Sequence, residues 1–115
     1  MEIATLEPMT IPMKRGPQDF KAGEIINLPD NLGRELLEGA PQMVRLISKE
    51  PLCVGQRVSY RYPTDIEGPT DYRWEPALGE IEAIDHEQHL ALIIPEHEPK
   101  AWLWVSLTYV KGLLS

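Results

Sequence analysis

Residues Lys100–Val110 read Lys-Ala-Trp-Leu-Trp-Val-Ser-Leu-Thr-Tyr-Val, a run of β-branched and aromatic residues that is typical of a β-strand. Side chains of a strand alternate between its two faces. One face is uniformly apolar and is expected in a core: Ala101, Leu103, Val105, Leu107 and Tyr109. The other face holds Trp102, Trp104, Ser106, Thr108 and Val110. We expect its two indole rings to be available to a partner.

The composition of the whole chain limits the classes of protein to which it belongs. Its 115 residues suffice for one core, or for a small barrel with an appendage. The net charge of -7 argues against partners bound through phosphates or anionic lipid and favours a protein partner with a basic surface. The single Cys53 is typical of a reducing cytoplasm. No secretory signal is recognisable, and no stretch approaches the roughly 20 apolar residues of a membrane helix. We therefore expect a cytoplasmic protein without a membrane partner.

The eleven prolines and eight glycines favour short strands and loops over long helices. In Met1–Met13, Pro8 and Pro12 interrupt the apolar residues, so we expect at best an edge strand or an arm. The polar segment Lys14–Asp19 is expected to be a loop.

A strand, a short helix and a second strand are expected next. The first strand lies around Glu24–Leu28 and the second over Met43–Ile47. Asp30 or Asn31 is expected to cap the helix, and Gly39 to end it in a left-handed conformation.

This segment resembles a strand-helix-strand motif found in many short phage and prophage proteins. The residues that carry the resemblance are Phe20-x-Ala22-Gly23-Glu24-Ile25-x-x-Leu28-Pro29-Asp30-x-Leu32, then Leu36-Leu37-x-Gly39-Ala40 and Val44. The resemblance implies an origin in a phage or other mobile element of a bacterium, and it implies no catalytic residue.

The second half predicts a meander of strands. Val54–Tyr62 alternates as a half-buried strand, with Val58, Tyr60 and Tyr62 on one face. A long loop is expected over Pro63–Pro76. Two further strands, Ala77–Ile84 and His89–Pro95, form a hairpin with a polar turn, and the tryptophan-rich strand follows.

This succession is similar to an SH3-like barrel. In that fold a single helical turn precedes the last strand, and Trp104–Val110 resembles this ending. We predict a mainly β fold with a small strand-helix-strand unit over residues 1–51 and an SH3-like β-barrel over residues 52–115. The acidic first-loop pattern of signalling SH3 domains is absent, so binding of proline-rich peptides is not implied. SH3-like barrels serve many tasks, and the fold does not select one of them.

Aromatic residues are the first candidates for a binding site. Tyr72 and Trp74, in the expected long loop, would meet Trp102 or Trp104 in a shallow groove that anchors a partner. The alternative is that the loop folds over the barrel and buries these rings as a satellite core.

Acidic residues are the second candidates. Ten acids lie between Asp65 and Glu98, opposed only by Arg73. The acidic surface is assigned to Asp65, Glu67, Asp71, Glu75, Glu80 and Glu82. Solubility explains most such runs. The sharper hypothesis is a surface that mimics nucleic acid and occupies the basic groove of a host protein.

Neither a metal site nor an enzyme is expected. His86, His89 and His97 lie among glutamates, but their spacing is not the helical His-Glu-x-x-His pattern, and one cysteine does not build a structural zinc site. The sequence has no nucleophile elbow and no phosphate-cradling glycine loop, so no cofactor is expected.

The favoured hypothesis is a non-enzymatic protein-interaction module that contacts its partner through the aromatic residues. An acidic inhibitor of a host defence protein is the alternative, and an ordinary host adaptor is the third possibility. Direct binding of nucleic acid is disfavoured by charge, and exposed sheet edges permit a homodimer.

Overall fold

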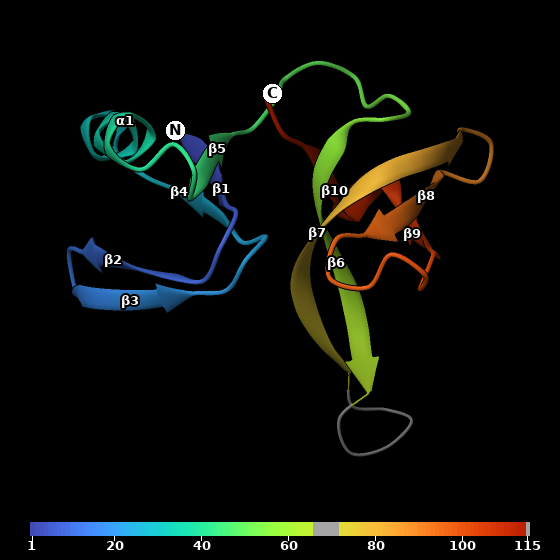
Figure 1. Cartoon of the computed structure of the whole chain (residues 1–115), viewed down its shortest axis with the longest axis horizontal. Coiled ribbons are helices and arrows are strands. Elements are labelled where there is room, and N and C mark those ends of the chain that lie inside the picture. Colours follow the sequence, from blue (N-terminus) through green and yellow to red (C-terminus); the bar gives the residue numbers. More distant parts are fainter. Residues whose placement is uncertain (66–71, 115) are drawn as a thin grey trace.

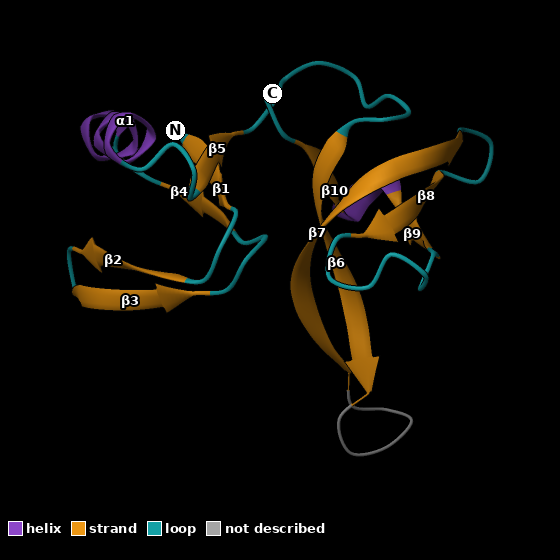
Figure 2. Ribbon diagram, in the orientation of Figure 1, coloured by secondary structure: helices purple, strands orange, loops and turns teal. Residues whose placement is uncertain are grey.

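A computed structural model of the chain describes residues 1–65 and 72–114, with Asp65 and Tyr72 described in their backbone only. The fold is mainly β, with one α-helix and a curled half-barrel sheet (Figures 1 and 2). The elements in chain order are β1 (Glu2–Thr5), β2 (Met9–Met13), β3 (Gly16–Phe20), β4 (Ile25–Asn27), α1 (Asp30–Gly39), β5 (Val44–Leu46), β6 (Arg57–Asp65), β7 (Tyr72–Asp85), β8 (Leu90–Pro95), β9 (Leu103–Ser106), the 3₁₀ turn η1 (Leu107–Tyr109) and β10 (Val110–Gly112). Among the described residues, no helix has the length and apolar character needed to cross a membrane.

The first strand lies at the centre of a sheet, so the expectation of an edge strand or arm over Met1–Met13 is wrong for β1, whereas β2 has a free edge as expected. β1 pairs antiparallel with β4 on one side and β5 on the other, and Ile3, Ala4 and Thr5 are fully buried. Pro8 and Pro12 both lie after β1. All the N–H groups of β1 therefore remain able to pair on either side.

The expected loop over Lys14–Asp19 is also wrong, because Gly16–Phe20 forms β3 and pairs with β2. Pro12 and Pro17 lie opposite each other in this two-stranded ribbon, where each strand has a free edge that tolerates a missing N–H. Gly16, with φ +114°, closes the tight turn at the end of the ribbon.

The predicted strand, helix and second strand are confirmed as β4, α1 and β5, but the predicted helix ends are wrong. The helix begins at Asp30 after Pro29, without a side-chain cap, and Gly39 is its last residue rather than a left-handed one. Leucines of α1 pack against the core of the N-terminal half. Tertiary packing therefore supplies stability that the caps do not.

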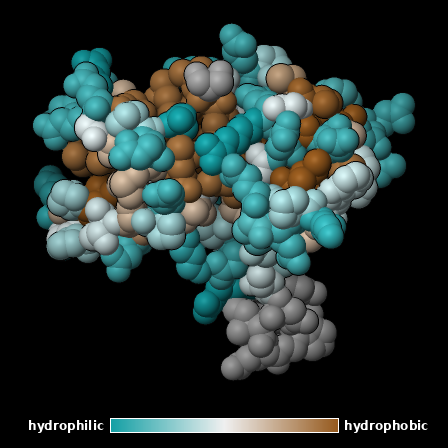
Figure 3. All heavy atoms as spheres, in the orientation of Figure 1, coloured by the Kyte–Doolittle hydropathy of each residue, from teal (hydrophilic) through white to brown (hydrophobic). Residues whose placement is uncertain are grey.

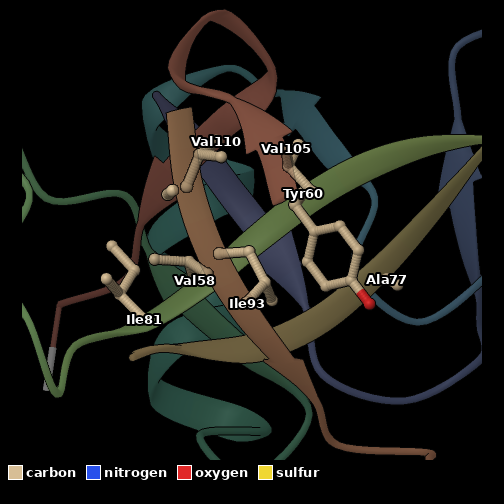
Figure 4. Packing of buried hydrophobic residues seen from close by; sticks show 8 residues of the cluster. Val58, Tyr60, Ala77, Ile81, Ile93, Val105 and Val110 are labelled. Carbon is tan, nitrogen blue, oxygen red and sulfur yellow. The ribbon is translucent and has the colours of Figure 1, made fainter. Parts of the chain in front are cut away.

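The second sheet has the strand order β10-β6-β7-β8-β9, and all its pairs are antiparallel. The turn η1 lies between β9 and β10 and leads the chain back to β6, so the predicted helical turn before the last strand is confirmed. Residues from all five strands meet in one apolar core on the inner face of the sheet (Figure 4). They are Val58, Tyr60, Ala77, Ile81, Ala91, Ile93, Val105 and Val110. Five strands that share one core must curl around it.

The long loop expected over Pro63–Pro76 is wrong for the residues that the structure describes. β6 and β7 form a hairpin whose register places Arg61 opposite Pro76, and Pro63 opposite Trp74. These positions lie beyond the stretches of β6 and β7 that pair with a third strand. Each strand has a free edge there, and prolines are tolerated at sheet edges.

The hairpin of β7 and β8 confirms the predicted pairing and polar turn. Asp85 Oδ1 accepts hydrogen bonds from the N–H groups of Glu87 and Gln88, both at 3.1 Å, and His89 adopts a positive φ of 59°. The side chain of Asp85 thus stabilises the turn locally.

The alternation predicted for Lys100–Val110 holds along β9, where Leu103 and Val105 face the core, and for Leu107 of η1, which packs against the same core. Because η1 interrupts the strand, Val110 is buried and Tyr109 is 42% exposed, and both predictions for these residues are wrong. Ala101, which precedes β9, is exposed as well.

A third apolar cluster joins the two halves of the chain, with Leu78 of β7 packed against Ala4 and Leu6. The buried Ser59 hydroxyl donates a hydrogen bond to the Gly23 carbonyl at 2.5 Å. The N-terminal half therefore covers part of the outer face of the second sheet, the face opposite its core.

Candidate protein-interaction surface

Apolar side chains gather on the outer face of β8 and β9. Because Ala91 and Ile93 point into the core, alternation directs Leu92 and Ile94 outward. Leu92 lies in register with Trp104 of β9. Within the described residues, neither Leu92 nor Ile94 is part of an apolar core cluster. Trp102 directly precedes β9, two residues before Trp104, and alternation assigns it to the same side. We call the residues Leu92, Ile94, Trp102 and Trp104 the β9 face.

The two tryptophans of the β9 face are solvent-exposed, Trp102 by 58% and Trp104 by 52%. The interpretation of these rings as a satellite core is therefore wrong. Trp102 Nε1 donates a hydrogen bond to the Pro99 carbonyl at 2.9 Å. This bond satisfies the polar atom of the indole and restricts the ring, so that its apolar surface is presented with little loss of conformational freedom on binding.

The β9 face is more exposed than the outer face of β6 and β7: Trp102 and Trp104 are exposed, whereas Leu92 and Ile94 are half-buried. On β6 and β7, Ser59 and Leu78 are buried against the N-terminal half. Apolar atoms reach the surface over β8 and β9, at the right of Figure 3, with polar atoms around them. Exposed aromatic side chains beside aliphatic ones, with polar residues around them, are typical of a protein interaction site.

The structure does not bring Trp74 together with Trp102 or Trp104. Trp74 lies near the start of β7, whereas Ala83 is the residue of β7 in register with Leu92, and thereby with Trp104. The stretch from Trp74 to Ala83 is roughly 30 Å of extended strand. Trp74 is 44% exposed and packs against Tyr109, with 4.6 Å between the ring centroids. The side chain of Tyr72 lies outside the described residues.

The predicted acidic surface is only partly available to a partner. Glu80 and Glu82 are exposed, and Glu80 lies in register with Ile94, at the border of the β9 face. The side chain of Glu75, in contrast, is 19% exposed and forms an ion pair with Lys21 at 2.6 Å. Glu67, Asp71 and the side chain of Asp65 lie outside the described residues.

Among the titratable side chains that the structure describes, one has a clearly perturbed pKa, and it lies in the core rather than on the β9 face. Burial, with smaller contributions from the nearby Tyr62 and Glu96, raises the pKa of Tyr60 to about 12. The residues that define the β9 face are apolar or aromatic. Within residues 1–65 and 72–114, no group of three or more His, Cys, Asp or Glu side chains is arranged to hold a metal ion.

Leu92 and Ile94 were not among the residues predicted for the site. The run Leu90–Pro95 is almost continuously apolar, so alternation alone does not separate its inner from its outer residues. An apolar residue at every position of a strand in a single-core barrel is nonetheless a signal, because only one of the two strand faces can reach that core.

Comparison of the chain with family models, with curated proteins and with solved structures found no match. Its function is therefore inferred from its own residues.

Proposed function

We propose that the chain is a non-enzymatic protein-interaction module that binds a protein partner through the β9 face. The observation that carries this proposal is the exposure of Trp102 and Trp104 beside two outward-facing aliphatic residues. Covering about 100 Å² of apolar surface on each indole would contribute roughly 2 to 3 kcal/mol to binding. Tryptophan is also enriched among the residues that dominate binding energy.

The partner that fits this surface has a basic region beside an apolar one. Glu80 and Glu82 border the apolar residues, and the chain carries a net charge of -7. Opposite charges at the rim accelerate association and favour the correct partner. A second copy of the chain is disfavoured as occupant, because pairing two β9 faces would bring the same carboxylates together.

We further propose that the half-barrel is SH3-like. The order of β6 to β9, the turn η1 and the return of β10 to β6 support this assignment. We also propose that the chain comes from a phage or mobile genetic element and acts in the cytoplasm of a bacterial cell. This proposal rests on the motif over Phe20–Val44.

The test compares two kinds of tryptophan variant. The immobilised chain is used to capture proteins from a bacterial lysate, and each captured protein is purified and titrated by calorimetry. The variant Trp102→Ala/Trp104→Ala is expected to lose at least about 100-fold in affinity, since two central anchors are removed. Trp74→Ala is the control, because it removes an exposed indole outside the β9 face, and its affinity should stay within about threefold of wild type. Equal affinity of the double variant and wild type would refute the proposal.

The alternative is an acidic inhibitor that mimics nucleic acid, supported by the net charge and by the exposure of Glu80 and Glu82. It predicts that Glu80→Lys/Glu82→Lys abolishes capture, that added salt weakens it steeply, and that the tryptophan variants change it little. The salt series and the two double variants thus separate the two functions.

A further inference from the structure

A cleft of about 340 Å³ opens between the N-terminal half and the second sheet, at the β10–β6 edge rather than at the β9 face. Residues of four segments line it: Ile25, Ser59, Arg61, Thr108, Tyr109 and Lys111. The cleft thus depends on the docking of the two halves, and it combines positive charge with an aromatic wall.

Two exposed cations project into one region of this cleft. Lys111 of β10 lies in register with Ser59 of β6, and Arg61 follows two residues along the same strand, so all three lie on one face of the sheet. Diagonal neighbours of this kind are separated by about 7 to 8 Å. Among the described residues, neither Arg61 nor Lys111 takes part in an ion pair. Two like charges at this spacing repel each other, and an anion between them removes the repulsion.

The walls of the cleft are partly apolar and are fixed in place. Tyr109 is held on one side by Trp74, and the half-buried Ile25 lies on another. The hydroxyl of Ser59 is already engaged, because it donates to the Gly23 carbonyl. The exposed Thr108 supplies a further polar side chain at the rim. The arrangement offers charge for oxygen atoms and an aromatic edge for an apolar body.

We propose that this cleft binds a small organic anion, whose carboxylate or phosphate oxygens lie between Arg61 and Lys111 and whose apolar body packs against Tyr109. Its volume is at the lower end of the roughly 300 to 1,000 Å³ of ligand pockets, which fits a ligand with one ring and one charged group. Guanidinium and ammonium groups both bind such oxygens by charge-assisted hydrogen bonds.

The test is a titration of the ¹⁵N-labelled chain followed by NMR, with phenyl phosphate and benzoate as probes and benzyl alcohol as the neutral control. Saturable shifts are expected at the amides of Ile25, Arg61, Tyr109 and Lys111. Whichever of the two anions binds more tightly identifies the preferred headgroup. The variant Arg61→Gln/Lys111→Gln should weaken binding about tenfold or more, as expected for the loss of two charge pairs. The matched variant Arg34→Gln/Lys100→Gln, which removes exposed cations elsewhere, should leave it unchanged.

Equal shifts with benzyl alcohol, or equal affinity of the two charge variants, would overturn the proposal. Should Arg61→Gln/Lys111→Gln fail to fold, the salt dependence of the wild-type chain decides instead. Binding that does not weaken on raising NaCl from about 0.02 to about 0.2 M is not driven by these charges. The outcome is independent of the β9 face, because none of these residues belongs to it.

Discussion

The rings of Trp74 and Tyr109 lie 4.6 Å apart between centroids, with an angle of 33° between their planes, although one belongs to β7 and the other to η1. In the sheet, β6 lies between β7 and β10, which follows directly after η1. The two rings therefore close over β6 from opposite sides. This contact connects the hairpin of β6 and β7 to the turn that leads into the last strand.

This ring pair predicts energetic coupling between the two positions. In a double-mutant cycle of Trp74→Ala and Tyr109→Ala, the coupling free energy should be about 1 kcal/mol, as for other aromatic pairs in contact. Urea unfolding of the four proteins measures it. A parallel cycle of Trp104→Ala and Tyr109→Ala provides the control and should be additive, because these rings are not an interacting pair. Additivity in both cycles would show that the Trp74–Tyr109 contact contributes nothing.

Gly23 predicts a large effect of a single methyl group. A Cβ at this position would lie 2.6 Å from the carbonyl carbon of Ala77, and Gly23 has φ +87°. Gly55 has φ +89° with no atom within 4 Å of the same Cβ position. Gly55→Ala should therefore lower the free energy of unfolding by only about 1 to 2 kcal/mol, through backbone strain. Gly23→Ala should lower the free energy of unfolding by about 3 kcal/mol or more, because a clash between the two halves adds to the strain.

The free energies of unfolding of the two glycine variants, measured in urea, test this difference directly. A loss of cooperative unfolding in Gly23→Ala alone agrees with the expected clash. Similar losses in both variants would mean that the N-terminal half does not dock on β7 as closely as described.

The phenol of Tyr60 predicts a loss of stability at alkaline pH. Its pKa is raised from 10.0 to about 12 in the folded chain, by burial first and by Tyr62 and Glu96 second. Below pH 10 the phenol is protonated in both states and its stabilising contribution is complete. As the pH rises from 10 to 12, the unfolded chain releases this proton first, and folding is weakened by about 2 to 3 kcal/mol.

Tyr60→Phe provides the comparison for the alkaline loss. The difference between wild type and this variant in the free energy of unfolding should change between about pH 9 and pH 11.5, as the unfolded wild-type chain ionises. A constant difference over this range would place the Tyr60 hydroxyl in contact with water.

Alternation predicted the inner face of β6 from the sequence, because Val58, Tyr60 and Tyr62 repeat at period two and reach one core. It did not predict the burial of Ser59, since a serine opposite an apolar face is typical of a solvent-facing position. Ser59 is buried because the N-terminal half lies against β6. Contacts between distant segments leave no periodic signal in either segment.

Proline was misleading in two places. Pro8 and Pro12 argue against a central strand anywhere in Met1–Met13, although both lie outside β1. Pro63 and Pro76 predicted a loop, yet both fit into β6 and β7 beyond the stretches paired with a third strand. The exclusion of proline from strands holds at positions hydrogen-bonded on both sides, and sequence alone does not identify those positions.

The aromatic candidates could be named from the sequence but not grouped. Trp102 and Trp104 were expected on an outward face and are exposed there. Their separation from Trp74 follows from the register of β7 and β8, which includes a bulge between Ile81 and Ala83. The sequence does not reveal this register. Leu92 and Ile94 join the tryptophans through the same register. The β9 face is therefore a property of strand pairing rather than of a motif.

Hydrogen–deuterium exchange of the chain, with and without a saturating amount of its captured partner, tests the β9 face most directly. Backbone amides of Leu90–Ser106 should become protected in the complex, while those of the β2–β3 ribbon should exchange at the same rate in both samples. Protection confined to the N-terminal half or to the cleft at Arg61, with Leu90–Ser106 unchanged, would contradict the proposed role of the β9 face.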